Sequence, residues 1–297
     1  GKIVHIGAVA SEAKKSIDAT GLVLAPGFID MHSHGDLMVL HDPTSPLKIH
    51  QGVTTELLGQ DGIGVSPISP PNVPGWRKFM SGIAGDPFSE WPWLGVDEYM
   101  EAASAAKPAV NVAMLLPYGN VRLETMGLGD RTPTPDELLR MKSMIADGME
   151  AGCFGMSVGL IYLPCCFSTK SELIEVYKSV APHSGIMVIH MRNEGDYLLE
   201  SMDEAMDIAR GADVPLHISH FKAAGKDNWY KYPMALQKIE DSRSAGLDIT
   251  FDQYPYVAAS TMLMALLPTW ALEGGVQCTM DRLKQIPIRD RIRVLLF

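Results

Sequence analysis

The chain has 297 residues, of which 46% are hydrophobic and 20% are charged, enough for one large barrel domain with an appendage. Its formal net charge of −10 argues against a nucleic-acid partner, because phosphate backbones are bound by basic patches. No apolar run reaches the roughly 18 residues of a membrane span. The longest run, Met262–Leu267, is followed by a proline. We therefore expect neither nucleic acid nor membrane as a partner.

Four cysteines occur without any Cys-x-x-Cys spacing, which is typical of reduced thiols in the cytosol (Cys153, Cys165, Cys166 and Cys278). The chain starts with the strand-like run Lys2–Ile6 and shows no signal-peptide pattern. We therefore expect a cytoplasmic protein.

In chain order, residues 1–24 contain two short strand-like pieces, Ile3–Ile6 and Leu22–Leu24, which are too little for a domain without strands from elsewhere. From residue 25 onward, strand and helix patterns alternate. The expected strands are Phe28–His32, Val53–Leu58, Val110–Leu116, Cys153–Val158, Ile186–His190, Pro215–His220 and Leu247–Phe251. The expected helices are Ser45–Gln51, Val96–Ala105, Thr134–Ala151, Ser168–Ser184, Tyr197–Arg210 and Tyr230–Ala245.

Thr134 begins its helix with Pro135 at the first helical position and Glu137 at the third, the pattern of a capping box. A long loop rich in proline and glycine is expected at Gly59–Trp93. Beyond Ser260 the chain reads as a loop and one helix, Thr279–Arg293.

Alternating strands and helices predict an α/β fold with a parallel sheet covered by helices. Seven strands are countable, and the eighth is not identifiable. An open doubly wound sheet is the alternative, but no Gly-x-Gly-x-x-Gly follows any strand. We predict a (β/α)8 TIM-like barrel at residues 25–262. Residues 263–297 are then an insertion or a C-terminal helical segment.

Four histidines lie at strand ends. His32 and His34 end the first strand two residues apart, so their side chains share a face. His190 and His220 are the last residues of two later apolar runs. A parallel barrel gathers its active site at these carboxyl ends, and neutral imidazole is a common metal ligand. We predict a metal centre for one or two zinc ions or another divalent metal. The alternative is four structural histidines.

Two cations follow these histidines. Lys222, two residues past His220, is placed to bind a carboxylate as a point charge, unless it is a solvated loop lysine. Arg192, two residues past His190, offers a bidentate contact to substrate. A salt bridge with Glu194 is the equally weighted alternative for Arg192.

Several motifs together resemble the amidohydrolase superfamily and, within it, the N-acyl-D-amino-acid deacylases, over almost the whole chain. They are Ala25-Pro-Gly-Phe-Ile-Asp-Met-His-Ser-His-Gly-Asp36, Gln51-Gly-Val-Thr-Thr55, Gly159-Leu-Ile-Tyr-Leu-Pro164, His190-Met-Arg-Asn-Glu-Gly195, Ile218-Ser-His-Phe-Lys222 and Asp252-Gln-Tyr-Pro-Tyr-Val-Ala-Ala-Ser-Thr261. The first motif is shared widely in the superfamily, and the last three together are specific to the deacylases.

This resemblance implies metal-dependent hydrolysis of the amide bond in N-acyl-D-amino acids, with a small N-acyl amino acid as the binding partner. It implies that the four histidines hold zinc. It also implies that three residues hold the carboxylate or carbonyl of the substrate (Lys222, Tyr254 and Ser260). Residues 1–24 resemble part of the family's small β-sandwich domain. The sequence leaves the acyl group, the side-chain preference and the oligomeric state open.

Two departures from the family stand out. Where the deacylases carry a metal-binding cysteine in Gly-Asn-Cys-Gly, this chain has Gly59-Gln60-Asp61-Gly62. Asp61 is expected to take over as a ligand, a harder one than thiolate, with a solvated turn residue as the alternative. The family's catalytic aspartate ends strand eight, which is expected beyond Phe297. We therefore assign no catalytic base, and expect this chain to be either a fragment or an inactive product.

Two other functions remain open. A cyclic-amide hydrolase of dihydroorotase or hydantoinase type usually carries a carboxylated lysine on its fourth strand, and Phe154–Val158 holds none. A non-catalytic, truncated metal-binding fragment is the alternative from a different class.

Overall fold

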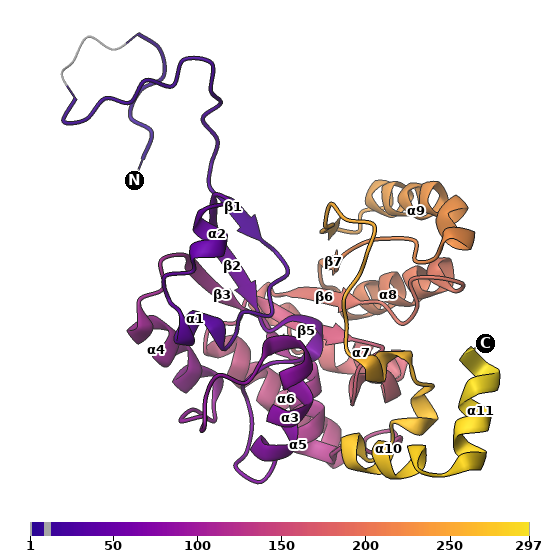
Figure 1. The fold of residues 1–297 in the computed structure, drawn as a ribbon. Coiled ribbons are helices and arrows are strands. Elements are labelled where there is room, and N and C mark those ends of the chain that lie inside the picture. The colour runs from indigo at the N-terminus through magenta and orange to yellow at the C-terminus, as the bar shows by residue number, and fades with distance from the viewer. Residues whose placement is uncertain (1, 9–12, 297) are drawn as a thin grey trace.

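The structure, a computed structural model, describes residues 2–8 and 13–296, in which parallel strands are joined by helices (Figure 1). The strands are β1 (Phe28–Asp30), β2 (Val53–Leu58), β3 (Asn111–Met114), β4 (Leu116–Pro117), β5 (Gly155–Gly159), β6 (Ile186–His190), β7 (Leu216–Ile218) and β8 (Ile249–Phe251). The helices before β5 are α1 (Met38–His41), α2 (Pro46–Ile49), α3 (Val73–Ala84), α4 (Val96–Ala106), α5 (Tyr118–Met126) and α6 (Pro135–Glu150). The later helices are α7 (Lys170–Tyr177), α8 (Leu198–Ala212), α9 (Tyr232–Ser244), α10 (Gly275–Leu283) and α11 (Ile286–Leu296).

All the strand pairs are parallel and follow chain order, β1-β2-β3 in one sheet and β4-β5-β6-β7-β8 in the other. β3 and β4 together occupy the single predicted strand Val110–Leu116 and are separated by Leu115, whose amide donates to the Leu58 carbonyl at 2.9 Å. β8 is therefore the seventh strand of the predicted series. Over residues 2–8 and 13–296 no ladder joins β8 back to β1.

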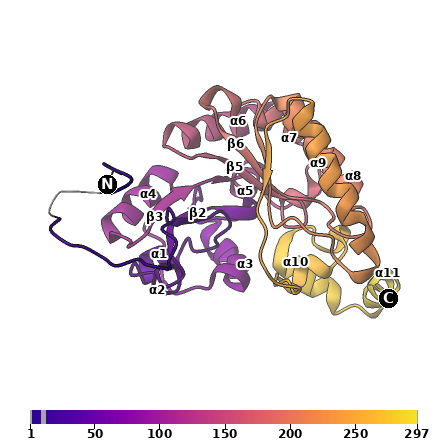
Figure 2. The same ribbon diagram turned by 90° about the horizontal axis from the view of Figure 1, so that it is seen from above.

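The strands β4 to β7 are buried almost throughout, as in a parallel sheet covered on both faces, whereas β1 has two exposed residues. A small separate cluster consists of Leu57 of β2, Leu115 between β3 and β4, and Val188 of β6. Neighbouring residues such as Leu58 and Met156 belong to the large cluster formed with the helices. Figure 2 shows α7, α8 and α9 along the outside of the strands. The α/β fold of the TIM-barrel type predicted from the sequence is confirmed.

The helices that begin with clear caps were predicted well. Thr134 caps α6: its hydroxyl accepts from the Glu137 amide at 3.3 Å, and its own amide donates to the Glu137 carboxylate at 2.9 Å. The prediction of one long loop at Gly59–Trp93 is wrong, because α3 lies within it. Pro74 and Gly75 are residues that usually indicate a loop, but proline is compatible with the first turn of a helix. Trp76 and Phe79 of α3 are buried and stacked, with ring centroids 4.9 Å apart.

Two terminal predictions are also corrected. Ile3–Ile6 and Leu22–Leu24 form no strand, and their side chains are exposed, because the described residues offer them no partner strand. The single helix predicted at Thr279–Arg293 is two helices, α10 and α11, with Pro287 in the first turn of the second. The assignment of residues 1–24 to a small β-sandwich stays a prediction. Within the described residues, no helix is both long and apolar enough to cross a membrane.

Candidate metal centre

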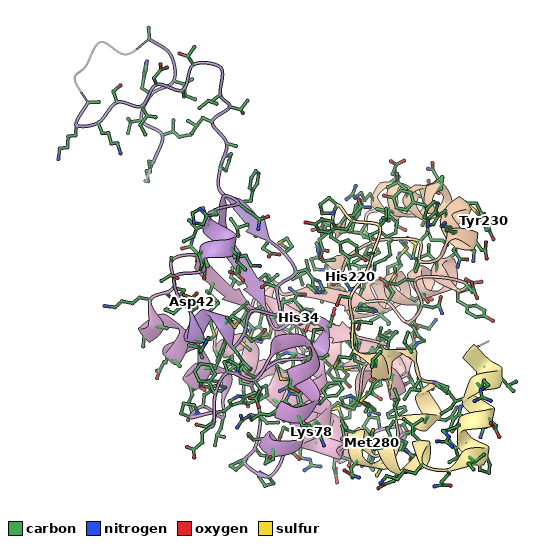
Figure 3. All side chains as sticks on the ribbon, viewed as in Figure 1. His34, Asp42, Lys78, His220, Tyr230 and Met280 are labelled. Carbon is green, nitrogen blue, oxygen red and sulfur yellow. The ribbon has the colours of Figure 1, made fainter. Side chains whose placement is uncertain are left out.

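The first two histidines of the site follow β1. β1 ends at Asp30, whose carboxylate accepts from the His32 amide at 3.1 Å and shapes the turn that follows. The His32 and His34 rings lie edge to face with centroids 5.3 Å apart, each with under a fifth of its side chain exposed. The prediction that these two imidazoles converge agrees with this geometry. Figure 3 labels His34 and His220 near the centre of the molecule, where its N-terminal and C-terminal parts meet.

Asp61 lies at the centre of the site, in a tight turn after β2. Its φ of +58° is left-handed, a conformation that aspartate adopts more readily than most residues. The amide of Gly62 donates to the Ser157 hydroxyl of β5 at 2.9 Å, which fixes the turn against the sheet. The Asp61 side chain is only 2% exposed. The loop after β2 therefore points one carboxylate into the carboxyl ends of the strands.

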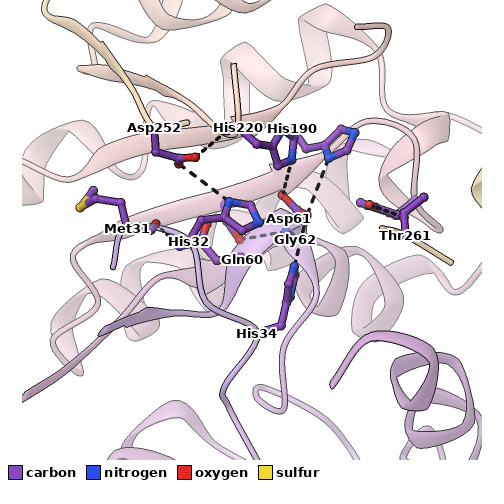
Figure 4. A network of polar contacts seen from close by, with 12 residues as sticks. Met31, His32, His34, Gln60, Asp61, Gly62, His190, His220, Asp252 and Thr261 are labelled. Carbon is purple, nitrogen blue, oxygen red and sulfur yellow. Dashed lines mark hydrogen bonds and ion pairs between the residues drawn. The ribbon is translucent and has the colours of Figure 1, made fainter. Parts of the chain in front are cut away.

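His190 and His220 complete the ring around Asp61 (Figure 4). The Asp61 Oδ2 atom lies 3.5 Å from His32 Nε2, 3.4 Å from His34 Nε2 and 3.7 Å from His190 Nδ1. The Oδ1 atom of the same carboxylate lies 3.9 Å from His220 Nε2. The His190 and His220 ring centroids are 4.4 Å apart. The structure thus gathers all five residues predicted as metal ligands.

The site is electrostatically coupled. Burial alone would raise the pKa of Asp61, but His32 and the other imidazoles close to it hold that pKa well below its usual value. Burial would lower the pKa of His32, yet the Asp61 charge raises it. For His220, burial dominates and lowers the pKa, which favours the neutral imidazole that metals bind. These shifts favour an ionised Asp61 and a neutral His220, the forms in which the two side chains bind metals.

The donor atoms fit a metal ion. Three buried atoms of these residues have no hydrogen-bond partner among the described residues (His32 Nδ1, Asp61 Oδ1 and His190 Nδ1). His32, Asp61 and His220 offer donor atoms that all lie within 4.8 Å of one another. Two ligands of one tetrahedral zinc ion, each bound at about 2.0 Å, lie about 3.3 Å apart. The observed spacing around Asp61 is close to that value, and imidazole and carboxylate are a suitable donor set for zinc.

The ring opens into a cavity of about 860 Å³. Lys222, Tyr254 and Ser260 line this cavity together with the histidines and Asp61. The Lys222 ammonium lies 5.5 Å from the centroid of the Tyr254 ring and 2.6 Å from the Glu194 carboxylate. The three residues predicted to hold the substrate are thus brought to the metal centre.

Arg192 is not placed with them. Its guanidinium donates to both oxygens of Glu204, at 2.9 to 3.2 Å, and to the carbonyls of Cys166 and Ser168. It is absent from the described residues that line the cavity. The structure therefore does not bring Arg192 to this cavity, and its ion pair is with Glu204 rather than with Glu194.

Sequence reasoning missed three residues of the site. Glu194, four residues past His190, hydrogen-bonds His220 Nδ1 at 2.9 Å. Burial opposes its charge, but His220, His190 and Lys222 lower the pKa of Glu194 to about 2. Asp252 accepts from the His220 amide at 2.7 Å and lies 2.9 Å from His217 Nε2. Tyr162 lines the cavity and pairs with Thr261 at 2.7 Å. All three lie in motifs quoted above, which was the available signal.

A parallel α/β barrel with histidines and a carboxylate at its strand ends defines a class of metal-dependent hydrolases. The sequence profile of the Amidohydrolase family matches residues 15–266, and the chain belongs to that family. It is 35% identical over 263 residues to the D-aminoacylase of Alcaligenes xylosoxydans xylosoxydans, an alignment covering 88% of this chain and 53% of the relative.

Two solved structures extend this similarity. One concerns the functional role of the binuclear metal centre in D-aminoacylase; it is 35% identical with a TM-score of 0.75, covering 86% of this chain and 52% of that one. The other is an N-acyl-D-glutamate deacylase from Bordetella bronchiseptica, complexed with zinc and a phosphonate inhibitor that mimics the tetrahedral intermediate. It is 31% identical with a TM-score of 0.71, covering 78% of this chain and 48% of that one. The chain spans about half the length of the curated relatives it matches.

Proposed function

We propose that this protein carries the metal centre of an N-acyl-D-amino-acid deacylase, which hydrolyses the amide bond of small N-acyl-D-amino acids. The observation that carries the proposal is the ring of four histidines around Asp61, opening into a cavity that contains Lys222. The relatives named D-aminoacylase and N-acyl-D-glutamate deacylase support this substrate class. We propose one or two zinc ions as the cofactor, as the binuclear and zinc-containing related structures suggest.

When bound, a zinc-like ion supplies a Lewis acid and brings the pKa of water toward neutrality. The residues of this chain then bind the remaining polar groups of the substrate. Lys222 offers an ammonium to the carboxylate that every N-acyl amino acid carries. Tyr254 and Ser260, which also line the cavity, are proposed to help hold that carboxylate or the amide carbonyl. The cavity of about 860 Å³ is large enough for an acyl group and a side chain.

Asp252 is poorly placed to be the general base, although it lines the cavity. One oxygen accepts from the backbone of His220 and the other lies 2.9 Å from His217 Nε2, so both are already engaged. We therefore keep Asp252 out of the proton-transfer step.

A reducing compartment such as the cytoplasm is proposed because the described cysteines are all unpaired thiols.

The cyclic-amide hydrolases are a weaker candidate. The strand where they carry a carboxylated lysine corresponds to β5, Gly155–Gly159, which contains no lysine. The lysine that does line the cavity, Lys222, is ion-paired with Glu194. Nothing in the donor set requires a carboxylated lysine, since Asp61 already supplies the central carboxylate.

The test combines metal analysis with a hydrolysis screen on N-acyl amino acids of both enantiomers. It compares the 297-residue chain with the product of its whole reading frame. We expect bound zinc and hydrolysis of the D-enantiomers. Asp61→Ala should lower zinc occupancy and activity at least tenfold, whereas Asp147→Ala, an exposed aspartate on α6, should change neither. Equal effects of the two substitutions would make Asp61 a mere turn residue. Metal binding without hydrolysis by either protein would favour the non-catalytic alternative.

A further inference from the structure

Glu194 connects two parts of the site that sequence reasoning treated separately. It lies in the loop after β6, and 15% of its side chain is exposed. Its Oε1 atom lies 2.9 Å from His220 Nδ1 and 2.6 Å from the Lys222 ammonium. Its Oε2 atom lies 4.0 Å from His190 Nε2. One carboxylate therefore contacts two candidate metal ligands and the candidate substrate-binding lysine.

The two histidines present opposite nitrogens to two carboxylates. His190 turns Nδ1 toward Asp61, at 3.7 Å, and Nε2 toward Glu194, at 4.0 Å. His220 turns Nε2 toward Asp61, at 3.9 Å, and Nδ1 toward Glu194, at 2.9 Å. Asp61 thus lies on the side of these two rings that would face a metal ion, and Glu194 lies on the opposite side.

The 2.9 Å separation of His220 Nδ1 and Glu194 Oε1 favours one tautomer of His220. An ionised carboxylate only accepts, so the bond to Glu194 requires the proton on Nδ1. The Nε2 lone pair is then free on the side that faces Asp61. Lys222 Nζ lies 2.9 Å from the same Nδ1, and a hydrogen bond between these two atoms would require the other tautomer, with the proton on Nε2. We favour the Nδ1 proton because His220 Nδ1 and the Lys222 ammonium both lie within hydrogen-bond distance of the single acceptor Oε1 of Glu194.

We propose that Glu194 is a positioning residue that fixes His220 as a metal ligand through Nε2 and, with the same oxygen, holds Lys222 in place for the substrate carboxylate. Histidine ligands commonly donate their other nitrogen to a carboxylate, and losing that partner typically weakens metal binding 10–100-fold. The inference rests on the metal centre under the proposed function.

The rival role is that Glu194 binds metal directly. His190, Glu194 and His220 do offer donor atoms within 4.8 Å of one another. However, Oε1 already accepts from His220 and Lys222, and an ion at this place would lie beside the Lys222 ammonium. The positive charge of Lys222 disfavours a cation there. The contacts therefore favour orientation over ligation.

The experiment measures zinc affinity in substrate-free protein by competition with a chromophoric chelator. Glu194→Ala should bind zinc 10–100-fold more weakly with unchanged stoichiometry, and Glu194→Gln, which keeps an acceptor oxygen, should lose less. Glu200→Gln, an exposed glutamate on α8, is the matched control and should bind as wild type does. The visible spectrum of the cobalt(II)-loaded protein should keep its band positions in both Glu194 variants. At saturating metal, Glu194→Gln should raise KM more than it lowers kcat.

Distinct results overturn the inference. Wild-type zinc affinity in Glu194→Ala would remove the proposed role while leaving the metal centre intact. Loss of one ion per chain, or a shifted cobalt spectrum, would make Glu194 a direct ligand. Wild-type protein that binds no metal would overturn the proposed function and this inference with it. Circular dichroism checks the fold of each variant, and Glu194→Gln carries the test if Glu194→Ala does not fold.

Discussion

Gly159, the last residue of β5, lies directly behind the Asp61 turn, and replacing it by alanine tests the geometry of the site. A Cβ at this position would lie 2.5 Å from the Asp61 carbonyl oxygen and 2.6 Å from the Tyr162 ring. Ordinary contacts begin near 3.4 Å, so the Asp61 backbone must retreat by about 0.9 Å. The perturbation thus moves the central carboxylate without changing any proposed ligand.

The size of the effect follows from overpacking. Inserting a methyl group into a packed interior costs about 1–3 kcal/mol. With an unfolding entropy of about 2.1 cal/mol/K per residue, a chain of this length should lose about 2–5 °C in Tm. Displacing the carboxylate should also weaken zinc binding on the order of 10–100-fold, the scale for disturbed ligand orientation. Thermal unfolding without metal and chelator competition measure the two effects separately.

Gly75→Ala is the matched control. Gly75 lies in the first turn of α3, where a Cβ would meet nothing within 4 Å. Because alanine is the better helix former, this change should be neutral or stabilise by up to about 1 kcal/mol. If Gly159→Ala matched Gly75→Ala in both Tm and zinc affinity, the Asp61 turn would not pack against β5 as the structure shows.

Two further predictions concern thiols and pH. Native protein at neutral pH should react quickly with a thiol reagent only at the exposed Cys278, because burial raises the pKa of the other three thiols to about 12 (Cys153, Cys165 and Cys166). Rapid labelling of a second site, mapped by peptide mass, would contradict their burial. The Arg131 guanidinium and the Thr134 amide lower the pKa of Glu137 to about 2, below its unfolded value of about 4.3. The stability that Glu137 contributes is therefore complete above that unfolded value and is lost as pH falls toward 2. The Tm difference between wild type and Glu137→Gln should shrink in acid, and a difference that grows would refute the cap.

The regular part of the fold was predictable because most strands are short, largely apolar runs that alternate with helical patterns. The predicted bounds Val53–Leu58 and Ile186–His190 are those of β2 and β6. The histidines were predictable for the same reason, since the strand-end position is itself the signal of a barrel site. Asp61 needed the family resemblance, because an aspartate between glycines otherwise indicates only a turn.

The misses have physical causes. α5 is buried almost all round, including Asn120 and Arg122, so it lacks the one-sided apolar pattern by which helices are recognised. Its polar residues are satisfied by partners distant in sequence: Arg122 pairs with Glu172 at 3.0 Å, and Asn120 bonds the loop after β2. Glu194 was missed similarly, because its partners His220 and Lys222 come from another strand.

The ring around Asp61 has a consequence for how the chain folds. His34 and His220 lie roughly 190 residues apart, so bringing them together closes a very long loop. Such contacts form late in folding, because the chain must lose the entropy of the long loop before the contacts can stabilise it. An ion held between them would act as a removable cross-link between the loops after β1 and β7, two strands that share no ladder in the described residues. Zinc should therefore slow amide hydrogen exchange most in β1, β7 and β8, and native-state exchange with and without zinc would show whether these strands form one cooperative unit.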